Sequence, residues 1–196
     1  PVLLHRAAAT LGVDMAAADP AMDAGLLKVG GRVEFAHPLV RSAAYSSAAA
    51  DNRHRVHRAL AEAIDGESDP DRRAWHRAHA AIAPDDEVAA ELERSAERAL
   101  RRGGVAAAAA FLERATALTP DRPKRGARAL DAAEAKFEAG SSATALELLT
   151  TAQLSPLDAL QRARLERLQA QIAYISSRGR DAPKLLLDAA RRLEPL

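Results

Sequence analysis

The sequence predicts a mainly α-helical protein with one short β-hairpin near its N-terminus. Three observations support this fold class. Alanine, which has the highest helix propensity, supplies 49 of the 196 residues. From about residue 85 onward, apolar residues recur at helical spacing between turn-forming glycines and prolines. Earlier in the chain, the residues on both sides of Gly30 and Gly31 alternate between apolar and polar, as paired strands do.

Composition limits the classes of function. Hydrophobic residues make up 48% of the chain and charged residues 28%, as in soluble globular proteins. The net charge of +1 gives no global attraction to nucleic acid or membrane, and the lack of cysteine excludes disulfides and thiol catalysis. No apolar run approaches the roughly 18 residues of a membrane span, and the start does not resemble a signal peptide. We expect a cytoplasmic protein with no membrane partner, cut from a longer polypeptide.

The stretch GLLKVGGRVEF predicts the β-hairpin. A two-residue loop would put Leu27 and Val29 on the face opposite Val33 and Phe35. A three-residue loop, residues 30–32, pairs Val29 with Val33 and Leu27 with Phe35 on one face. Because a slip of one residue exposes a whole apolar set, we predict the three-residue loop.

A helix from Pro38 to about Ala49 is expected after the hairpin. Proline suits the first helical position, where its missing N–H matters least. The order of helix, hairpin and helix is that of the later half of a winged helix. We therefore predict a partial winged-helix domain over residues 1–50.

Residues 51–196 are predicted to form a second domain of repeated helical hairpins. Turn residues recur at intervals of 36 to 39 positions, at Gly103, Gly140 and Gly179 and at Pro120, Pro156 and Pro195. Each interval predicts a helix, a glycine turn, a second helix and a proline that cannot continue it. The period is close to the 34 residues of tetratricopeptide (TPR) repeats, so the hairpins are expected to be TPR-like.

Helical spacing of apolar residues supports these hairpins. The residues predicted to share a buried face are Val88, Leu92, Ala96 and Ala99; Leu130, Ala133 and Phe137; and Leu165, Leu168, Ile172 and Ile175. An earlier hairpin is predicted around Pro84. There Asp85 and Asp86 suit the N-terminus of its second helix.

The segment GLLKVGGRVEFAHPLVRSAAY resembles the winged-helix part of the large ATP-binding LuxR-type transcriptional regulators, which belong to the STAND class of signalling ATPases. DPDRRAWHRAHAA and AAAAAFLERATALTPD resemble the helical region that follows it. The resemblance implies a P-loop ATPase module upstream and a helix-turn-helix DNA reader downstream. The chain itself contains no P-loop motif and no basic recognition helix. It therefore resembles the regulatory middle of such a protein, with no catalytic residues and no direct contact with DNA.

The resemblance also assigns a role to His37 and Arg41. In related switch ATPases a Met-His-Asp motif, followed by Leu and Arg, places a histidine on the bound ADP. The segment AHPLVR is similar at His37, Leu39 and Arg41, and it departs at Ala36 and Pro38. The implied role is nucleotide sensing in the full-length protein, which would bind ATP or ADP, with no cofactor in this chain. The alternative reading is that His37 caps or packs against the following helix.

Other candidate residues favour structural roles. The pairs His54/His57 and His76/His79 lack further ligands for a metal, and we expect no metal site. Trp75 is predicted to anchor the core between hairpins. The arginine clusters DNRHRVHR, DRPKRGAR and RRL are expected to lie on solvated helix faces or to form ion pairs between helices. Three serines near His37 lack the motif of a nucleophile: Ser42, Ser46 and Ser47.

The function that we expect is regulatory rather than enzymatic. The helical repeats would bind an effector molecule or a protein partner, and the winged helix would pass this event to the upstream ATPase module. A free-standing TPR-like scaffold without any nucleotide link is the alternative. Direct DNA binding through the winged helix is a third reading, which the near-neutral charge disfavours.

Overall fold

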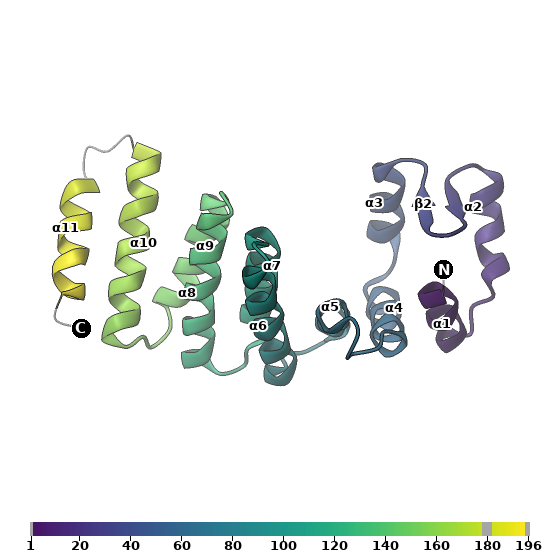
Figure 1. The fold of residues 1–196 in the computed structure, drawn as a ribbon, viewed down its shortest axis with the longest axis horizontal. Coiled ribbons are helices and arrows are strands. Elements are labelled where there is room, and N and C mark those ends of the chain that lie inside the picture. The colour runs from purple at the N-terminus through teal and green to yellow at the C-terminus, as the bar shows by residue number, and fades with distance from the viewer. Residues whose placement is uncertain (1, 178–181, 195–196) are drawn as a thin grey trace. The chain divides into compact units, whose positions relative to one another are not determined.

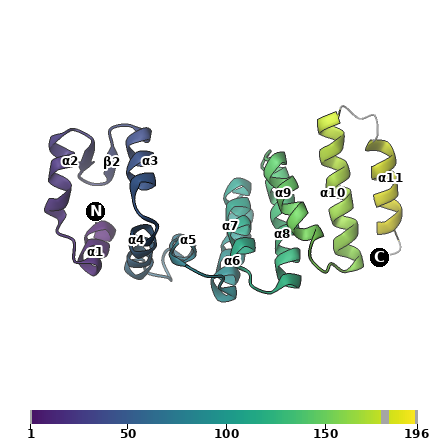
Figure 2. The same ribbon diagram turned by 180° about the vertical axis from the view of Figure 1, so that it is seen from behind.

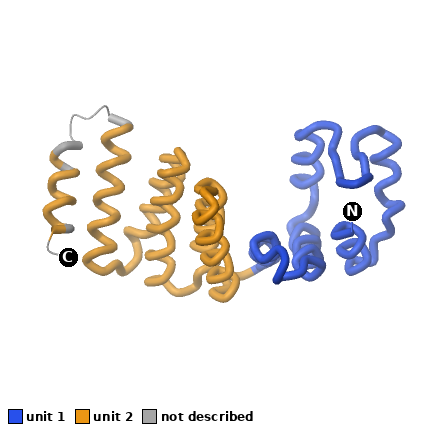
Figure 3. Tube along the Cα trace, viewed as in Figure 1, with its two compact units in different colours: residues 1–82 blue, residues 83–196 orange. Residues whose placement is uncertain are grey.

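A computed structural model describes residues 2–177 and 182–194 of the chain (Figure 1). The predicted fold class, mainly helical with a small two-stranded antiparallel sheet, is confirmed. The chain divides into two compact units, Pro1–Ile82 and Ala83–Leu196, which are coloured separately in Figure 3. Each unit is described separately below.

The first unit combines short helices with the hairpin. Its elements are α1 (Val2–Leu11), the 3-10 helix η1 (Met15–Ala18), α2 (Asp19–Asp23), β1 (Leu27–Val29), β2 (Val33–Phe35), α3 (Pro38–Ser47), α4 (Ala50–Ala63) and α5 (Pro70–Ala80). α1 packs against α4, and α4 packs against α5. The small core between α1 and α4 centres on Ala7, Ala59 and Ala63, with leucine side chains around it.

The β-hairpin has the predicted register. Leu27 pairs with Phe35 and Val29 pairs with Val33, so residues 30–32 form the three-residue loop. Val33 and Phe35 keep 39% and 38% of their surface exposed. The apolar side chains of β2 are therefore only partly covered by the rest of the first unit.

In the second unit, the regular elements of residues 83–177 and 182–194 are all helices. They are α6 (Asp86–Arg101), α7 (Val105–Leu118), α8 (Arg122–Glu138), α9 (Ser142–Gln153), α10 (Ala159–Ser177) and α11 (Ala182–Leu193). Neighbours in the sequence pack as α6 with α7, α8 with α9 and α10 with α11. α7 also packs against α8, and α10 against α9 and α8, so the pairs form a continuous row (Figures 1 and 2).

Glycine turns join the helices of the first two pairs, as predicted. Gly103 and Gly140 have φ angles of 76° and 80°, a left-handed conformation that favours glycine. Pro120 and Pro156 follow the ends of α7 and α9. The predicted turn at Gly179 and the proline at Pro195 lie outside the described residues.

The core of the second unit follows the predicted apolar faces, with one exception. Leu92, Leu130 and Leu168 are almost completely buried, and burial of such a side chain contributes about 2 kcal/mol. Ile175 was predicted on the same face as Leu168, but 63% of its surface is exposed. It lies near the end of α10, within the last turn before Ser177, beyond the reach of the core that α8 and α9 provide.

The hairpin predicted around Pro84 involves α5 and α6, which belong to different units. Both helices form, and Asp85 caps α6 by accepting hydrogen bonds from the N–H groups of Glu87 and Val88 at 3.0 and 3.1 Å. α5 packs against α4, however, and belongs to the first unit. Its small residues Ala74 and Ala78 are buried there.

The boundary between the two compact units falls after Ile82, and the division at about residue 50 into a winged helix and a helical repeat stays a prediction. The first unit extends beyond residue 50 because α4 packs against both α1 and α5. Among the helices within residues 2–177 and 182–194, none has the length and apolar character needed to cross a lipid bilayer.

Candidate functional site

A cavity of about 720 Å³ lies in the first unit, between β2, α3, α4 and α5. Its wall combines aromatic rings, imidazoles, small polar groups and one guanidinium. The lining residues are Phe35, Pro38, Arg41, Ser42, Ala44, Tyr45, Ser46, His57, Trp75, His76 and His79.

Helical periodicity brings these residues to one place. On α3, the cavity-lining positions Pro38, Arg41, Ser42 and Tyr45 have the spacing i, i+3, i+4 and i+7 and so share one face of the helix. On α5, Trp75 and His79 are separated by one turn in the same way. The cavity is therefore formed by one face of α3 opposite residues of α4 and α5.

Hydrogen bonds link three helices across the cavity. Tyr45 Oη on α3 lies 3.1 Å from His57 Nε2 on α4, and His57 Nδ1 lies 2.9 Å from His76 Nδ1 on α5. Each of the two contacts needs one donor and one acceptor. Both contacts are satisfied whether the shared proton is on Nδ1 of His57 or on Nδ1 of His76. In both arrangements all the rings can remain neutral.

Ring contacts extend this cluster. The ring of His57 lies 5.1 Å from that of His76 and 5.0 Å from that of His79, measured between centroids. Trp75 contacts His79 edge to face at 4.5 Å. These distances are typical of packed aromatic pairs. We call Tyr45, His57, Trp75, His76 and His79 the histidine cluster.

Partial burial keeps His76 uncharged at neutral pH. Burial of His76, together with the neighbouring His57, Arg72 and His79, lowers the pKa of His76 to about 4. No Asp, Glu or Lys belongs to the wall, and Arg41 is its one arginine. Within residues 2–177 and 182–194, the side chain of Arg41 forms no hydrogen bond and no ion pair.

The two predicted nucleotide-sensing residues have different surroundings. His37 lies at the N-cap of α3, where its Nδ1 accepts a hydrogen bond of 3.1 Å from the N–H of Leu39. The helix-capping role is therefore confirmed, and the neutral ring carries its proton on Nε2. Arg41 lies one turn later and lines the cavity, whereas His37 does not.

The histidine cluster was not predicted. The sequence indicated two separate pairs, but the structure combines His57 with His76 and His79 and leaves His54 outside. Trp75 was predicted to be a core anchor, and it lies half-buried on the cavity wall instead. No sequence signal connects α4 to α5 in this way, because the contact depends on tertiary packing. Within the described part of the chain, no group of three His, Asp or Glu residues is placed to hold a metal ion.

The nearby serines show no catalytic arrangement. Ser42 and Ser46 line the cavity, and Ser47 donates a hydrogen bond to the carbonyl of Ala44 at 3.2 Å. Among the described residues, none of the three forms a hydrogen bond with a histidine.

The predicted ion pairs between helices are present in the second unit. Arg128, which is buried, donates to Asp86 at 2.5 Å, to Glu93 at 2.7 Å and to Thr119 at 2.7 Å. Lys124, from the same arginine-rich segment, pairs with Asp86 at 2.9 Å. The hydrogen bond from Lys124, followed by that from Arg128, lowers the pKa of Asp86.

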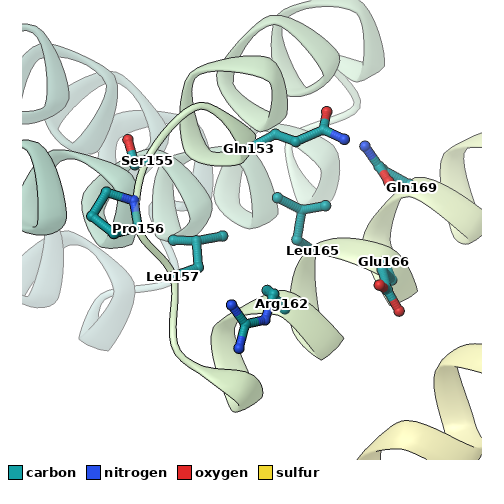
Figure 4. A pocket seen from close by; sticks show the side chains of 8 residues that line it. All are labelled: Gln153, Ser155, Pro156, Leu157, Arg162, Leu165, Glu166 and Gln169. Carbon is teal, nitrogen blue, oxygen red and sulfur yellow. The ribbon is translucent and has the colours of Figure 1, made fainter.

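A second, smaller cavity of about 350 Å³ lies between the end of α9 and α10 (Figure 4). In Figure 4 the side chains of Gln153 and Gln169 point toward one another across it. Arg162 and Glu166 are on the α10 side, and Glu166 also pairs with Arg192 of α11. Its wall has no aromatic ring, so the first cavity is the stronger candidate site.

No protein-family model matches the chain, and no curated protein or solved structure matches it significantly.

Proposed function

We propose that the chain is the regulatory middle segment of an ATP-dependent LuxR-type transcriptional regulator. The order of its elements supports this proposal: a short helix, a β-hairpin and a capped helix over residues 19–47, then a row of paired helices. In the proposed arrangement, residues 1–50 act as a partial winged helix and the later helices as a TPR-like array.

The local geometry at His37 is the main observation in favour. Strand β2 ends at Phe35 and α3 begins at Pro38, with His37 between them as the N-cap. Because Nδ1 is used for capping, the neutral ring presents Nε2–H as its donor. A donor beside a helix N-terminus suits a phosphate oxygen, and Arg41 follows one turn later. This combination could sense ADP or ATP bound by an upstream module.

The paired helices would bind the regulatory effector or protein partner. A row of helix pairs offers an extended surface whose curvature can change when an effector or a protein partner binds. Coupling requires that this binding favours one of two conformations, and that the two differ in affinity for nucleotide. The cytoplasm is the expected location, and the proposed segment neither binds DNA nor catalyses a reaction.

The proposal is tested by nucleotide retention in the full-length protein. His37→Ala removes both the cap and the ring, whereas His37→Asn keeps a good N-cap acceptor and removes the imidazole. We expect both variants to lose bound ADP during gel filtration, by roughly tenfold if one charge-assisted hydrogen bond is lost. Retention by His37→Asn at the level of the unmodified protein would show that His37 only caps α3.

The reading frame around the chain separates this proposal from the alternative. A P-loop module before it and a helix-turn-helix after it support the regulator. The alternative is a free-standing helical scaffold, which is favoured by exposed apolar side chains on the second unit, such as Leu146 and Leu154, at 45% and 72% exposure. A translation start close to Pro1 would support that scaffold.

A further inference from the structure

We propose that the cavity in the first unit binds a small, planar aromatic molecule that carries a single negative charge. Arg41 would bind the charged group, and Phe35, Tyr45 and Trp75 would contact the ring. This proposal does not depend on the regulatory role proposed above, because it rests on the cavity alone.

The size of the cavity suits a small molecule. Ligand sites usually measure about 300–1,000 Å³ and are lined by apolar and aromatic side chains with a few polar groups. The volume of about 720 Å³ lies within this range. Tyr45 keeps 51% of its surface exposed and Phe35 keeps 38%, so large apolar rings remain available to a ligand.

The polar groups are placed where they can orient a ligand. The hydroxyls of Ser42 and Ser46 line the cavity beside Arg41, and none of these three side chains forms a hydrogen bond with another described residue. A guanidinium that lacks a carboxylate partner can bind a carboxylate or sulfonate with two parallel hydrogen bonds. The hydroxyls can donate to the same group.

The charge of the wall limits the ligand to about one negative charge. Arg41 is the one Lys or Arg residue of the wall, and no carboxylate belongs to the wall to repel an anion. His76 adds no positive charge at neutral pH, because partial burial and its charged neighbours lower its pKa to about 4. A nucleotide or nucleic-acid strand carries several phosphates and would need more cations than this cavity offers.

Aromatic surface distinguishes this site from a simple anion site. The histidine cluster presents the ring of Trp75 beside that of His79, and Tyr45 is held by its hydrogen bond to His57. Rings that are already fixed lose little conformational freedom when a flat ligand packs against them. The ligand that fits these features is an aromatic acid rather than an aliphatic one.

The test uses two probes with the same ring system. 8-Anilinonaphthalene-1-sulfonate carries one negative charge, and N-phenyl-1-naphthylamine lacks the sulfonate. Trp75 is the only tryptophan of the chain, so quenching of its emission by either probe reports binding close to this cavity. We expect the sulfonate to quench Trp75 with a single site and to bind about tenfold more tightly than the uncharged probe.

Arg41→Gln is the decisive variant, and Arg55→Gln is its matched control. Arg55 is an exposed arginine of α4 that does not line the cavity, so its substitution changes the net charge by the same amount. We expect Arg41→Gln to weaken the sulfonate about tenfold and leave the uncharged probe within about twofold, and Arg55→Gln to change neither. The proposal is overturned if the sulfonate fails to quench Trp75, if both probes bind equally, or if the two variants behave alike.

Discussion

Replacing Gly126 with alanine should destabilise the second unit, although the same replacement inside a helix usually stabilises a protein. Gly126 lies within α8, where alanine would normally stabilise the helix by about 1 kcal/mol. A Cβ atom at this position, however, would lie 2.4 Å from the Cβ of Ser155 and 3.1 Å from Cδ2 of Leu157. Carbon atoms in contact prefer separations of about 3.5–4.0 Å.

The expected magnitude follows from how the clash can be relieved. The Cβ of Ser155 is attached to the backbone, so rotation of its side chain cannot remove it, and the segment after α9 must move away from α8. Overpacking of this kind typically costs about 1–3 kcal/mol. After the gain of about 1 kcal/mol from helix propensity, we expect a net loss of about 1 kcal/mol in the free energy of unfolding.

Urea denaturation followed by circular dichroism measures this loss, and a double-mutant cycle assigns its cause. Ser155→Gly removes the clashing Cβ together with a hydrogen bond to the carbonyl of Thr151. The free energy of unfolding of the double variant should exceed the value expected from adding the two separate effects by about 1 kcal/mol or more. A more stable Gly126→Ala protein, or additive effects in the cycle, would refute the close contact between α8 and the segment after α9.

Two further predictions concern charged and titratable groups. The pKa of His76 in the folded chain, about 4, lies below the ordinary 6.5, so the unfolded chain binds more protons between these values. The free energy of unfolding should therefore fall as pH drops from 6.5 to 4, by about 1–2 kcal/mol after allowance for partial exposure, and urea titrations of His76→Gln should lack this dependence. Arg128→Met should lower the free energy of unfolding by about 1–3 kcal/mol, since it leaves Asp86 and Glu93 without their buried partner. Lys124→Met removes an exposed pair and should change the urea midpoint much less, whereas equal shifts for both variants would contradict the role of burial.

Local rules predicted a large part of the fold. The register of the hairpin followed from the alternation of Leu27, Val29, Val33 and Phe35, because only one register puts all four side chains on one face. The turns at Gly103 and Gly140 followed from their spacing and from the backbone freedom of glycine. The hairpin register and the glycine turns depend on residues close together in the sequence, so local sequence patterns are sufficient to predict them.

Which helix packs against which other helix could not be predicted from local patterns. Helix α5 packs against α4 in the first unit, where Ala74 and Ala78 are buried, and no local pattern predicted this contact. The contact between His57 and His76 joins residues 19 positions apart on different helices. Alanine-rich faces are nearly interchangeable, so periodicity identifies a buried face without identifying the helix that covers it.

The candidate site was only partly predictable. His37 and Arg41 were identified through the resemblance of AHPLVR to a known motif, and the capping alternative for His37 is confirmed. The cavity beside Arg41 was not predicted, because its wall is shared by three helices and a strand. Its serine, histidine and tryptophan residues are distributed over three helices, so no sequence motif connects them.

The abundance of buried alanine in the second unit has a consequence for how this protein can evolve. Several of its most buried positions are alanines, among them Ala89, Ala108, Ala129, Ala132, Ala133, Ala145 and Ala152. A single base change in an alanine codon yields valine, threonine, serine, proline, glycine, aspartate or glutamate. Each of these adds bulk, introduces a polar group or weakens the helix. Inherited variation should therefore accumulate on the outward-facing positions, while the interior changes only when two neighbouring residues are replaced together.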